Sequence, residues 1–317
     1  METLRAEKIT VALVQARPRL NDLSATVEKA IELISQASRS GAGLVVFGET
    51  FLSGYPAWLD HSPGAALWNH EPTRRVYAQM RQNSVTVPGR WTETLGTAAR
   101  DNHVNVVMGL NERVDQGVGT GTLYNSLITF DRSGKLVNHH RKLVSTFSER
   151  LVHGNGDGDG LAVVDTSCGR VGGLICWEHW MPLARQAMHN AGEDIHAAVF
   201  PTVHEMHQVT CRQYAFEGRC FVLAVGSILL ARDMPADLAV ADGVDPDTFL
   251  LRGGSCVIGP DGSFVTEPIF DTETIIISEL DLTLIDREKM TLDVSGHYSR
   301  PDIFEFNVRR GSREDDT

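Results

Sequence analysis

Cys176 stands where a nucleophile could act. It follows a short apolar run, Val171 to Ile175, that is preceded by glycines and typical of a buried strand. Pro182 then opens a run with helical character, Leu183 to Asn190, where a missing N–H costs nothing. A strand-to-helix turn lifts a side chain out of its sheet and leaves the next main-chain N–H, that of Trp177, free to face a developing oxyanion. We also expect the nearby helix start to favour the thiolate.

Two further residues stand at the ends of predicted strands. Glu49 follows the apolar run Leu44 to Phe47, at the position where α/β folds place reactive groups, although a strand-end glutamate can also simply face water. Lys142 lies where a predicted strand, Lys135 to His140, gives way to a long loop. A carboxylate can take the proton of a thiol, and an ammonium stabilises both a thiolate and an anionic intermediate. Without such neighbours, Cys176 would be interpreted as a small buried apolar residue.

The elements that would position these groups alternate along the chain. Ile9 to Ala16 predicts a first strand, and apolar residues at helical spacing from Val27 to Ala37 predict a helix with Asn21 or Asp22 as its N-cap. With the strand at Leu44 this makes a βα unit of a mostly parallel or mixed sheet. Further helices are predicted at 68–82, 92–101 and 205–218, further strands at 104–110, 123–130, 162–165, 197–200, 221–225 and 274–280, and a hairpin at 254–265 with its turn at 260–262.

The chain has 317 residues, enough for one large domain, and it shows no internal repeat or linker. Residues 1–308 are therefore predicted to form one domain, and the charged tail 309–317 is predicted to be disordered. The formal net charge of −12 argues against a nucleic acid or an anionic membrane as partner.

Targeting and metal signals are also weak. The start lacks the apolar core of a signal peptide, and the longest apolar run, Phe221 to Ala231, is shorter than the ~20 residues of a membrane helix. Five cysteines without regular spacing predict reduced thiols and a cytoplasmic protein. His204 and His207 share a helix face but lack a third ligand, so we expect no metal. A Cys–His dyad with His179 or His153 stays open as an alternative.

In motif content the chain resembles the nitrilase superfamily, and within it the true nitrilase branch, from Ile9 to about Phe306. Together, in this order and spacing, the motifs are specific. They are Phe47–Thr50 with Gly54–Pro56, His140–Leu143 with Glu149–Arg150, Gly173–His179, Met181–Arg185, and Gly296–Asp302. One departure is Gly48, where the family pattern most often has proline.

The resemblance implies a four-layer αββα sandwich that needs no metal or organic cofactor. It places the family's Glu-Lys-Cys triad at Glu49, Lys142 and Cys176, and its second glutamate at Glu149, which would orient the lysine and the substrate or water. It also implies a homodimer or a higher homo-oligomer.

The function expected from the resemblance is hydrolysis of an organic nitrile to a carboxylic acid and ammonia. Tyr55, Trp180 and Phe200 are candidate pocket walls, and aromatic walls would suit an aryl or arylaliphatic nitrile. The substrate expected overall is an arylaliphatic or aliphatic nitrile. The alternatives are an amidase or an amide-forming, nitrile hydratase-like activity on the same residues. Outside this group stand a non-catalytic scaffold protein and a metallohydrolase built on His204 and His207.

Overall fold

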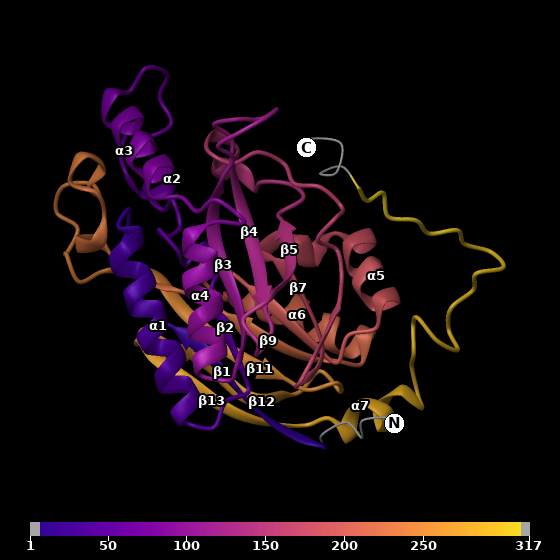
Figure 1. Ribbon diagram of the computed structural model, residues 1–317. Helices are drawn as coiled ribbons and strands as arrows, with labels where there is room; N and C mark the ends of the chain where they lie inside the picture. The colour runs from indigo at the N-terminus through magenta and orange to yellow at the C-terminus, as the bar shows by residue number, and fades with distance from the viewer. Residues whose placement is uncertain (1–6, 312–317) are drawn as a thin grey trace.

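The computed structural model describes residues 7–311 as two β-sheets packed face to face and covered by helices on both outer sides (Figure 1). The first sheet has the strand order β13-β1-β2-β3-β4-β5, and the second has the order β10-β11-β9-β8-β7-β6, with β12 paired to β11. Both sheets are mixed, since β1-β2-β3 and β7-β8-β9 run parallel and the outer strands run antiparallel. The expected four-layer αββα sandwich is confirmed.

The strands of the first sheet are β1 (Lys8–Gln15), β2 (Leu44–Phe47), β3 (Asn105–Arg113), β4 (Leu123–Phe130), β5 (Leu136–Arg141) and β13 (Thr274–Asp281). Those of the second are β6 (Val164–Thr166), β7 (Gly169–Ile175), β8 (Ile195–Val199), β9 (Phe221–Val225), β10 (Ile228–Leu230), β11 (Phe249–Ile258) and β12 (Phe264–Phe270).

The α-helices are α1 (Leu23–Arg39), α2 (Trp58–His61), α3 (Glu71–Gln82), α4 (Arg90–Asp101), α5 (Pro182–Ala191), α6 (Glu205–Gly218) and α7 (Thr283–Lys289). Short 3₁₀ turns are η1 (Phe147–Leu151), η2 (Cys176–Trp180), η3 (Ala231–Asp233) and η4 (Ala236–Leu238). Of the two candidate caps of α1, Asp22 is the N-cap, because its carboxylate accepts the N–H of Ala25 at 3.0 Å.

The layers follow from the period of two in β1. Val11 and Leu13 point into the core between the sheets, whereas Ala12 and Val14 pack in a second cluster with the apolar face of α1. Helices α1 and α4 cover this outer face of the first sheet, and α5 and α6 cover the outer face of the second (Figure 1). The two sheets thus bring the ends of β2 and β7, each followed by a predicted site residue, into one interior.

Beyond α7 the chain runs away from the sheets and returns at residues 306–311 (Figure 1). Arg310 donates to the carbonyl of Leu161, and the Gly311 N–H donates to Asp159. Residues 309–311 therefore lie against the body of the protein, while 312–317 lie outside the described residues. The single domain over 1–308 and the disordered tail stay predictions.

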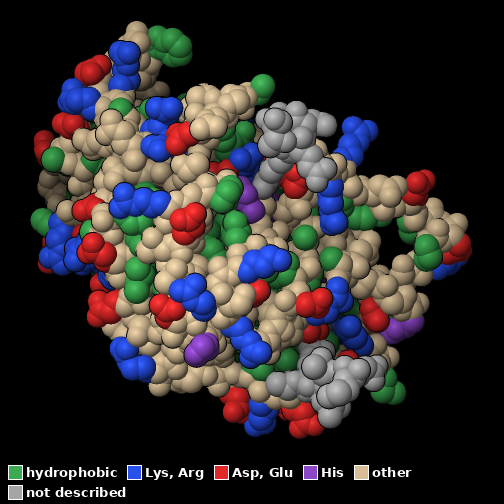
Figure 2. Space-filling view, viewed as in Figure 1, with side chains coloured by type: hydrophobic (Ala, Val, Ile, Leu, Met, Phe, Trp, Pro, Cys, Tyr) green, Lys and Arg blue, Asp and Glu red, His purple; other side chains and the backbone are tan. Residues whose placement is uncertain are grey.

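On the face shown in Figure 2, basic and acidic side chains are interspersed rather than gathered into fields of one sign. Among residues 7–311, no helix is long and apolar enough to cross a membrane.

Candidate active site

Glu49 lies just past β2 and is almost completely buried. Asn125 on β4 donates its side-chain amide to Oε1 of Glu49 at 2.6 Å, and Lys142 Nζ donates to the same oxygen at 2.9 Å. The other oxygen, Oε2, has no hydrogen-bond partner among the described residues. Burial raises the pKa of Glu49 to about 7, against the opposing effect of the Lys142 ammonium. One oxygen is thus held in place and the other is left open.

Lys142 follows the last residue of β5 and is as deeply buried as Glu49. Its main-chain N–H donates to the Asn125 carbonyl at 2.8 Å, which fixes the start of the loop beside β4. Its ammonium also bonds both carboxylate oxygens of Glu149, at 3.0 and 2.7 Å. Burial lowers the pKa of Lys142, but the neighbouring Glu49 and Glu149 carboxylates outweigh that effect and raise the pKa above its ordinary value. The lysine is therefore a buried cation between two carboxylates.

Glu149 is on the 3₁₀ turn η1, where its carboxylate also accepts the N–H of Thr146 at 3.2 Å. The Tyr55 hydroxyl donates to Glu149 Oε1 at 2.9 Å. Glu149 therefore joins the lysine to the aromatic loop that follows Glu49. Tyr55, predicted as a pocket wall, lies in this network with its hydroxyl committed to Glu149.

Cys176 is the first residue of η2, directly after β7, and α5 begins at Pro182 as the sequence predicts. Its φ of 53° is in the left-handed region, which is strained for a residue with a side chain. The expected preference for the thiolate is wrong for the resting protein, since burial and the Glu49 charge raise the pKa of the thiol well above its usual value. Lys142 and the Trp177 N–H, which is hydrogen-bonded to the sulfur, lower it by less.

These contacts define what the arrangement can do chemically. A neutral thiol needs a base at the moment of attack, and Glu49 offers an ionisable oxygen without another hydrogen bond. The lysine ammonium stands within the same buried group of charges and can stabilise an anion that develops there.

The remaining predicted residues differ in their exposure to solvent. Trp177 is 57% exposed, and its ring lies tilted against that of Trp180 with 5.5 Å between the ring centres. Phe200 is completely buried, with its ring 5.1 Å from that of His179 and 4.7 Å from that of His207. Its part in substrate binding stays a prediction.

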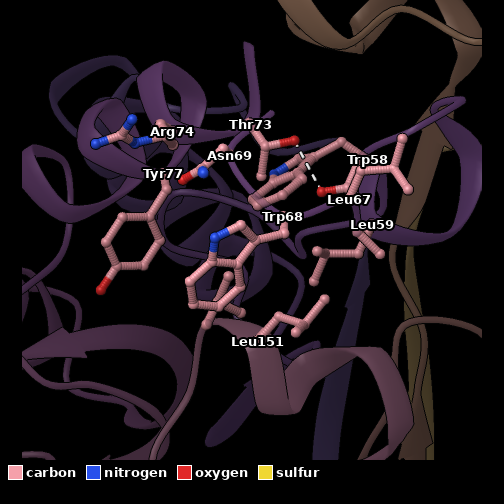
Figure 3. A pocket seen from close by; sticks show the side chains of 12 residues that line it. Trp58, Leu59, Leu67, Trp68, Asn69, Thr73, Arg74, Tyr77 and Leu151 are labelled. Atoms are coloured by element: carbon pink, nitrogen blue, oxygen red, sulfur yellow. Dashed lines mark hydrogen bonds between the residues drawn. The ribbon is translucent and has the colours of Figure 1, made fainter. Parts of the chain in front are cut away.

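Two hollows lie near the site. The larger has a volume of about 760 Å³ and lies between the loop that follows β5 and the turn that follows Cys176. Its walls are Val144, Thr146, Phe147, Arg150, Trp177, Trp180 and Met181. The smaller, about 370 Å³, lies between the α2–α3 segment and the end of η1, and Figure 3 shows Trp58, Trp68, Tyr77 and Leu151 around it.

The histidine alternatives meet different neighbours. His179 uses Nδ1 on the main-chain carbonyl of Cys176 at 2.7 Å and Nε2 on His196 at 3.0 Å, so neither nitrogen is free for the thiol. His153 pairs through Nε2 with Asn111 at 2.9 Å, and burial lowers its pKa to about 4. In the part of the chain described, no group of three or more His, Cys, Asp or Glu side chains could hold a metal ion.

Two polar residues of the site were missed from the sequence. Asn125 holds Glu49, as described above, and Glu178 lies two residues after Cys176. The Glu178 carboxylate accepts the N–H of Leu143 at 2.8 Å, the N–H of Ile175 at 2.7 Å, and His140 Nε2 at 2.9 Å. It thereby fixes the backbone beside Lys142 and beside Cys176 at once. His140 and Glu178 each belong to one of the motifs named above, but only the fold shows that their side chains are hydrogen-bonded to each other.

This fold and this buried group of a thiol, two carboxylates and an ammonium define a carbon–nitrogen hydrolase. Residues 10–289 match the carbon-nitrogen hydrolase family, and the chain belongs to it. It is 38% identical to an aliphatic nitrilase of Sinorhizobium fredii, over 95% of this chain and 96% of that protein. It is 36% identical to nitrilase 2 of Arabidopsis thaliana, over 95% and 88% of the two chains. These similarities confirm membership of the nitrilase branch.

Two further comparisons extend this result. A bifunctional nitrilase/nitrile hydratase of Nicotiana tabacum is 34% identical, over 95% of this chain and 86% of its own length. Among solved structures, Saccharomyces cerevisiae Nit3 superposes with a TM-score of 0.70 at 22% identity, covering 94% of this chain and 99% of that one. At that identity the structure supports the fold alone.

Proposed function

We propose that the protein is a nitrilase that hydrolyses an aliphatic or arylaliphatic nitrile to a carboxylic acid and ammonia, through a covalent intermediate on Cys176. The observation that carries the proposal is the buried group of Glu49, Lys142, Glu149 and Cys176, in which one oxygen of Glu49 has no hydrogen-bond partner among the described residues. The named nitrilases similar to this chain over nearly its whole length support the reaction class.

The reaction begins when Glu49 Oε2 takes the thiol proton and the sulfur attacks the nitrile carbon. The nitrile nitrogen gains that proton, which gives a thioimidate bound to Cys176. Water, activated by Glu49, adds to the same carbon, and ammonia leaves so that a thioester remains. A second water then releases the acid and restores the thiol, so that one nitrile and two waters give one acid and one ammonia.

Lys142 and the Trp177 N–H would stabilise the negative charge of each tetrahedral state. Both are fixed before the reaction, so they pay little reorganisation when the charge forms. Glu149 would hold the lysine in position through its two hydrogen bonds. The chemistry uses side chains, one main-chain N–H and water, and requires no metal or organic cofactor.

The hollow between Phe147 and Trp180 is where we place the organic part of the nitrile. Its walls are mostly apolar and aromatic, and it borders the turn that carries Cys176. Trp180, Tyr55 and Phe200 remain the proposed substrate-binding residues. We further propose a cytoplasmic homodimer or higher homo-oligomer without a nucleic-acid or membrane partner.

The test is release of acid and ammonia from phenylacetonitrile, 3-phenylpropionitrile, benzonitrile and an aliphatic dinitrile, with the matching amides alongside. Acid and ammonia in equal amounts from nitriles, abolished in Cys176→Ala, are expected. Amide as the main product would instead identify a hydratase-like enzyme, and turnover of amides alone would identify an amidase. Substantial nitrile turnover by Cys176→Ala would overturn the proposal.

A further inference from the structure

Beneath the nucleophile turn, four buried polar side chains from four segments form one line of hydrogen bonds. His179 Nδ1 bonds the Cys176 carbonyl at 2.7 Å, and its Nε2 lies 3.0 Å from Nε2 of His196 on β8. His196 Nδ1 lies 2.7 Å from Oε1 of Glu193, and the hydroxyl of Tyr214 on α6 donates to Oε2 of Glu193 at 2.5 Å. All four side chains are at most 3% exposed.

The protons in this line can be counted from its first member. A carbonyl oxygen only accepts, so His179 carries its proton on Nδ1 and, when neutral, accepts at Nε2. His196 must then donate from Nε2 and, when neutral, accept at Nδ1. Its partner there is Glu193, which can donate only as a carboxylic acid. The other oxygen of Glu193 is a carbonyl that accepts from Tyr214.

We propose that Tyr214, Glu193, His196 and His179 form a buried relay that positions the nucleophile turn through the Cys176 carbonyl, and that the relay's acidic proton resides on Glu193. The assignment to catalysis rests on the proposed function of Cys176. These are positioning residues, since none of them contacts the sulfur or the neighbouring Lys142 by a hydrogen bond.

The surroundings of the relay agree with this proton count. Burial lowers the pKa of His179 and of His196 to about 3, so both rings are neutral near pH 7. Burial also raises the pKa of Glu193 to about 7, although the Tyr214 hydrogen bond, His189 and Arg170 pull it down. A neutral line also avoids the cost of an isolated ion pair in a dry interior.

The relay lies beside a strained residue, Cys176, whose backbone conformation needs support. Cys176 has the strained φ of 53°, and such a conformation persists only when its surroundings hold it. The His179 ring is hydrogen-bonded to the main-chain carbonyl of Cys176. The main-chain carbonyl of His179 in turn accepts hydrogen bonds from the Arg185 side chain at 3.1 Å and from the Thr210 hydroxyl at 3.2 Å. The turn is thus held at two successive points against α5 and α6.

The relay also explains why β7, the strand before Cys176, has a glycine at position 172. A Cβ added at Gly172 on β7 would lie 2.0 Å from Oε1 of Glu193, closer than any side chain tolerates. Gly172 therefore leaves the space that the Glu193 carboxyl occupies beside the sheet.

The first test compares Glu193→Gln with Glu193→Leu in the full chain. Glutamine can donate from its amide to His196 Nδ1 and accept from Tyr214, as the carboxylic acid does, whereas leucine can do neither. We expect Glu193→Leu to lower kcat about tenfold or more with KM changed little, and Glu193→Gln to restore most of that loss. A Glu193→Gln enzyme as impaired as Glu193→Leu would overturn the neutral relay.

The second test reads the protons directly and does not depend on nitrile turnover. In protein labelled with ¹⁵N at histidine, NMR distinguishes protonated from bare ring nitrogens, and His179→Gln and His196→Gln assign the signals. At pH 6, below the pKa of about 7 that burial gives Glu193, we expect a proton on Nδ1 of His179 and on Nε2 of His196, with the other two nitrogens bare. Protons on both nitrogens of His196 would overturn the proposal, since they would mean an imidazolium paired with ionised Glu193.

The two proposals can fail separately. Nitrilase activity that survives Cys176→Ala would refute the proposed function whatever the histidine spectra show. Expected activity with the wrong tautomers would refute the relay and leave the nitrilase intact.

Discussion

At the residue scale, the two oxygens of Glu49 have different tasks. Oε1 is held by Asn125 and Lys142, and Oε2 is open among the described residues. Burial raises the pKa of this carboxyl to about 7, so a base that works only when ionised loses its function in mild acid. We therefore expect kcat/KM to fall about tenfold for each pH unit below that pKa.

Asn125 should set the pH at which this fall of kcat/KM, the acid limb of the pH profile, begins. Its amide donates to the ionised carboxylate, which lowers the pKa of Glu49, so Asn125→Leu should raise the pKa and move the limb to higher pH. The measurement is kcat/KM against pH in both proteins. Asn138→Leu is the matched control, because among the described residues that amide bonds only main-chain carbonyls, those of Gly160 at 3.2 Å and Ala162 at 3.5 Å. An unmoved limb in Asn125→Leu would show that Glu49 is not the base.

At the element scale, Glu178 joins the end of β7 to the segment after β5. Its carboxylate accepts main-chain N–H groups beside both Cys176 and Lys142, and the His140 interaction lowers its pKa below the usual value against the effect of burial. Glu178→Gln would turn an amide N–H toward one of these donors. We expect the free energy of unfolding to fall by about 2–4 kcal/mol, because charged hydrogen bonds and a buried acceptor are lost.

The same change should separate kcat from KM. The two segments should shift relative to each other, which lowers kcat at least about tenfold while KM changes little. Glu178→Asp, which keeps the charge but shortens the reach, should lie between the two proteins. The measurement is kcat and KM of the unmodified protein, Glu178→Gln and Glu178→Asp at a temperature where all three proteins are folded. An unchanged kcat in Glu178→Gln would contradict the positioning role of Glu178.

The departure from the family pattern at Gly48 also has a local cause. A Cβ at this position would lie 2.5 Å from the Ser227 hydroxyl, which comes from the segment between β9 and β10 and has no hydrogen-bond partner among residues 7–311. Gly48→Ala should therefore cost about 1–3 kcal/mol of stability through overpacking.

Ser227→Ala removes that oxygen, and the next contact of the added Cβ is then an ordinary 3.5 Å. The double variant Gly48→Ala with Ser227→Ala should recover most of the lost stability, as urea unfolding of the four proteins in a double-mutant cycle would measure. Simple addition of the two effects would mean that the clash is relieved in another way.

The elements themselves could be predicted well because local pattern decides them. The apolar run at β1, the helical spacing in α1 and the apolar run before Cys176 each matched the structure. The hydrogen bonds between elements could not be predicted, because their partners lie far apart in the sequence. Asn125 and Glu49 are 76 residues apart, and Glu178 and Leu143 are 35 residues apart. Sequence spacing carries no information about which polar groups from distant strands face each other in the fold. Lys142 was singled out by its place at the end of a predicted strand, whereas Glu149 was placed only through the resemblance.

At the scale of the whole molecule, the interior holds several neutral histidines. Burial lowers the pKa to about 4 for His153 and His189 and to about 3 for His179 and His196. In the unfolded chain these rings take up protons near pH 6.5, so below that pH the unfolded state holds more protons than the folded state. Acid therefore destabilises the fold through each of them until the folded pKa is reached.

Two carboxyls act in the opposite direction. The pKa of Glu49 and that of Glu193 are raised to about 7, so between pH 7 and the unfolded value of 4.5 the folded state binds these protons first and gains stability as the pH falls. With His207, whose pKa burial also lowers to about 4, five histidines outnumber the two carboxyls, which leaves a net uptake of about three protons on unfolding near pH 5.5. The free energy of unfolding should then fall by about 4 kcal/mol per pH unit in this range.

Urea unfolding between pH 5.5 and 7 measures this slope. His189→Leu should reduce it by about 1.4 kcal/mol per pH unit, since one ring no longer titrates and its Nε2 has no hydrogen-bond partner to lose among the described residues. His61→Gln, at the exposed end of α2, is the control and should leave the slope unchanged. A stability that is flat or rises on acidification would mean that buried carboxyls, rather than histidines, dominate the proton balance of the fold.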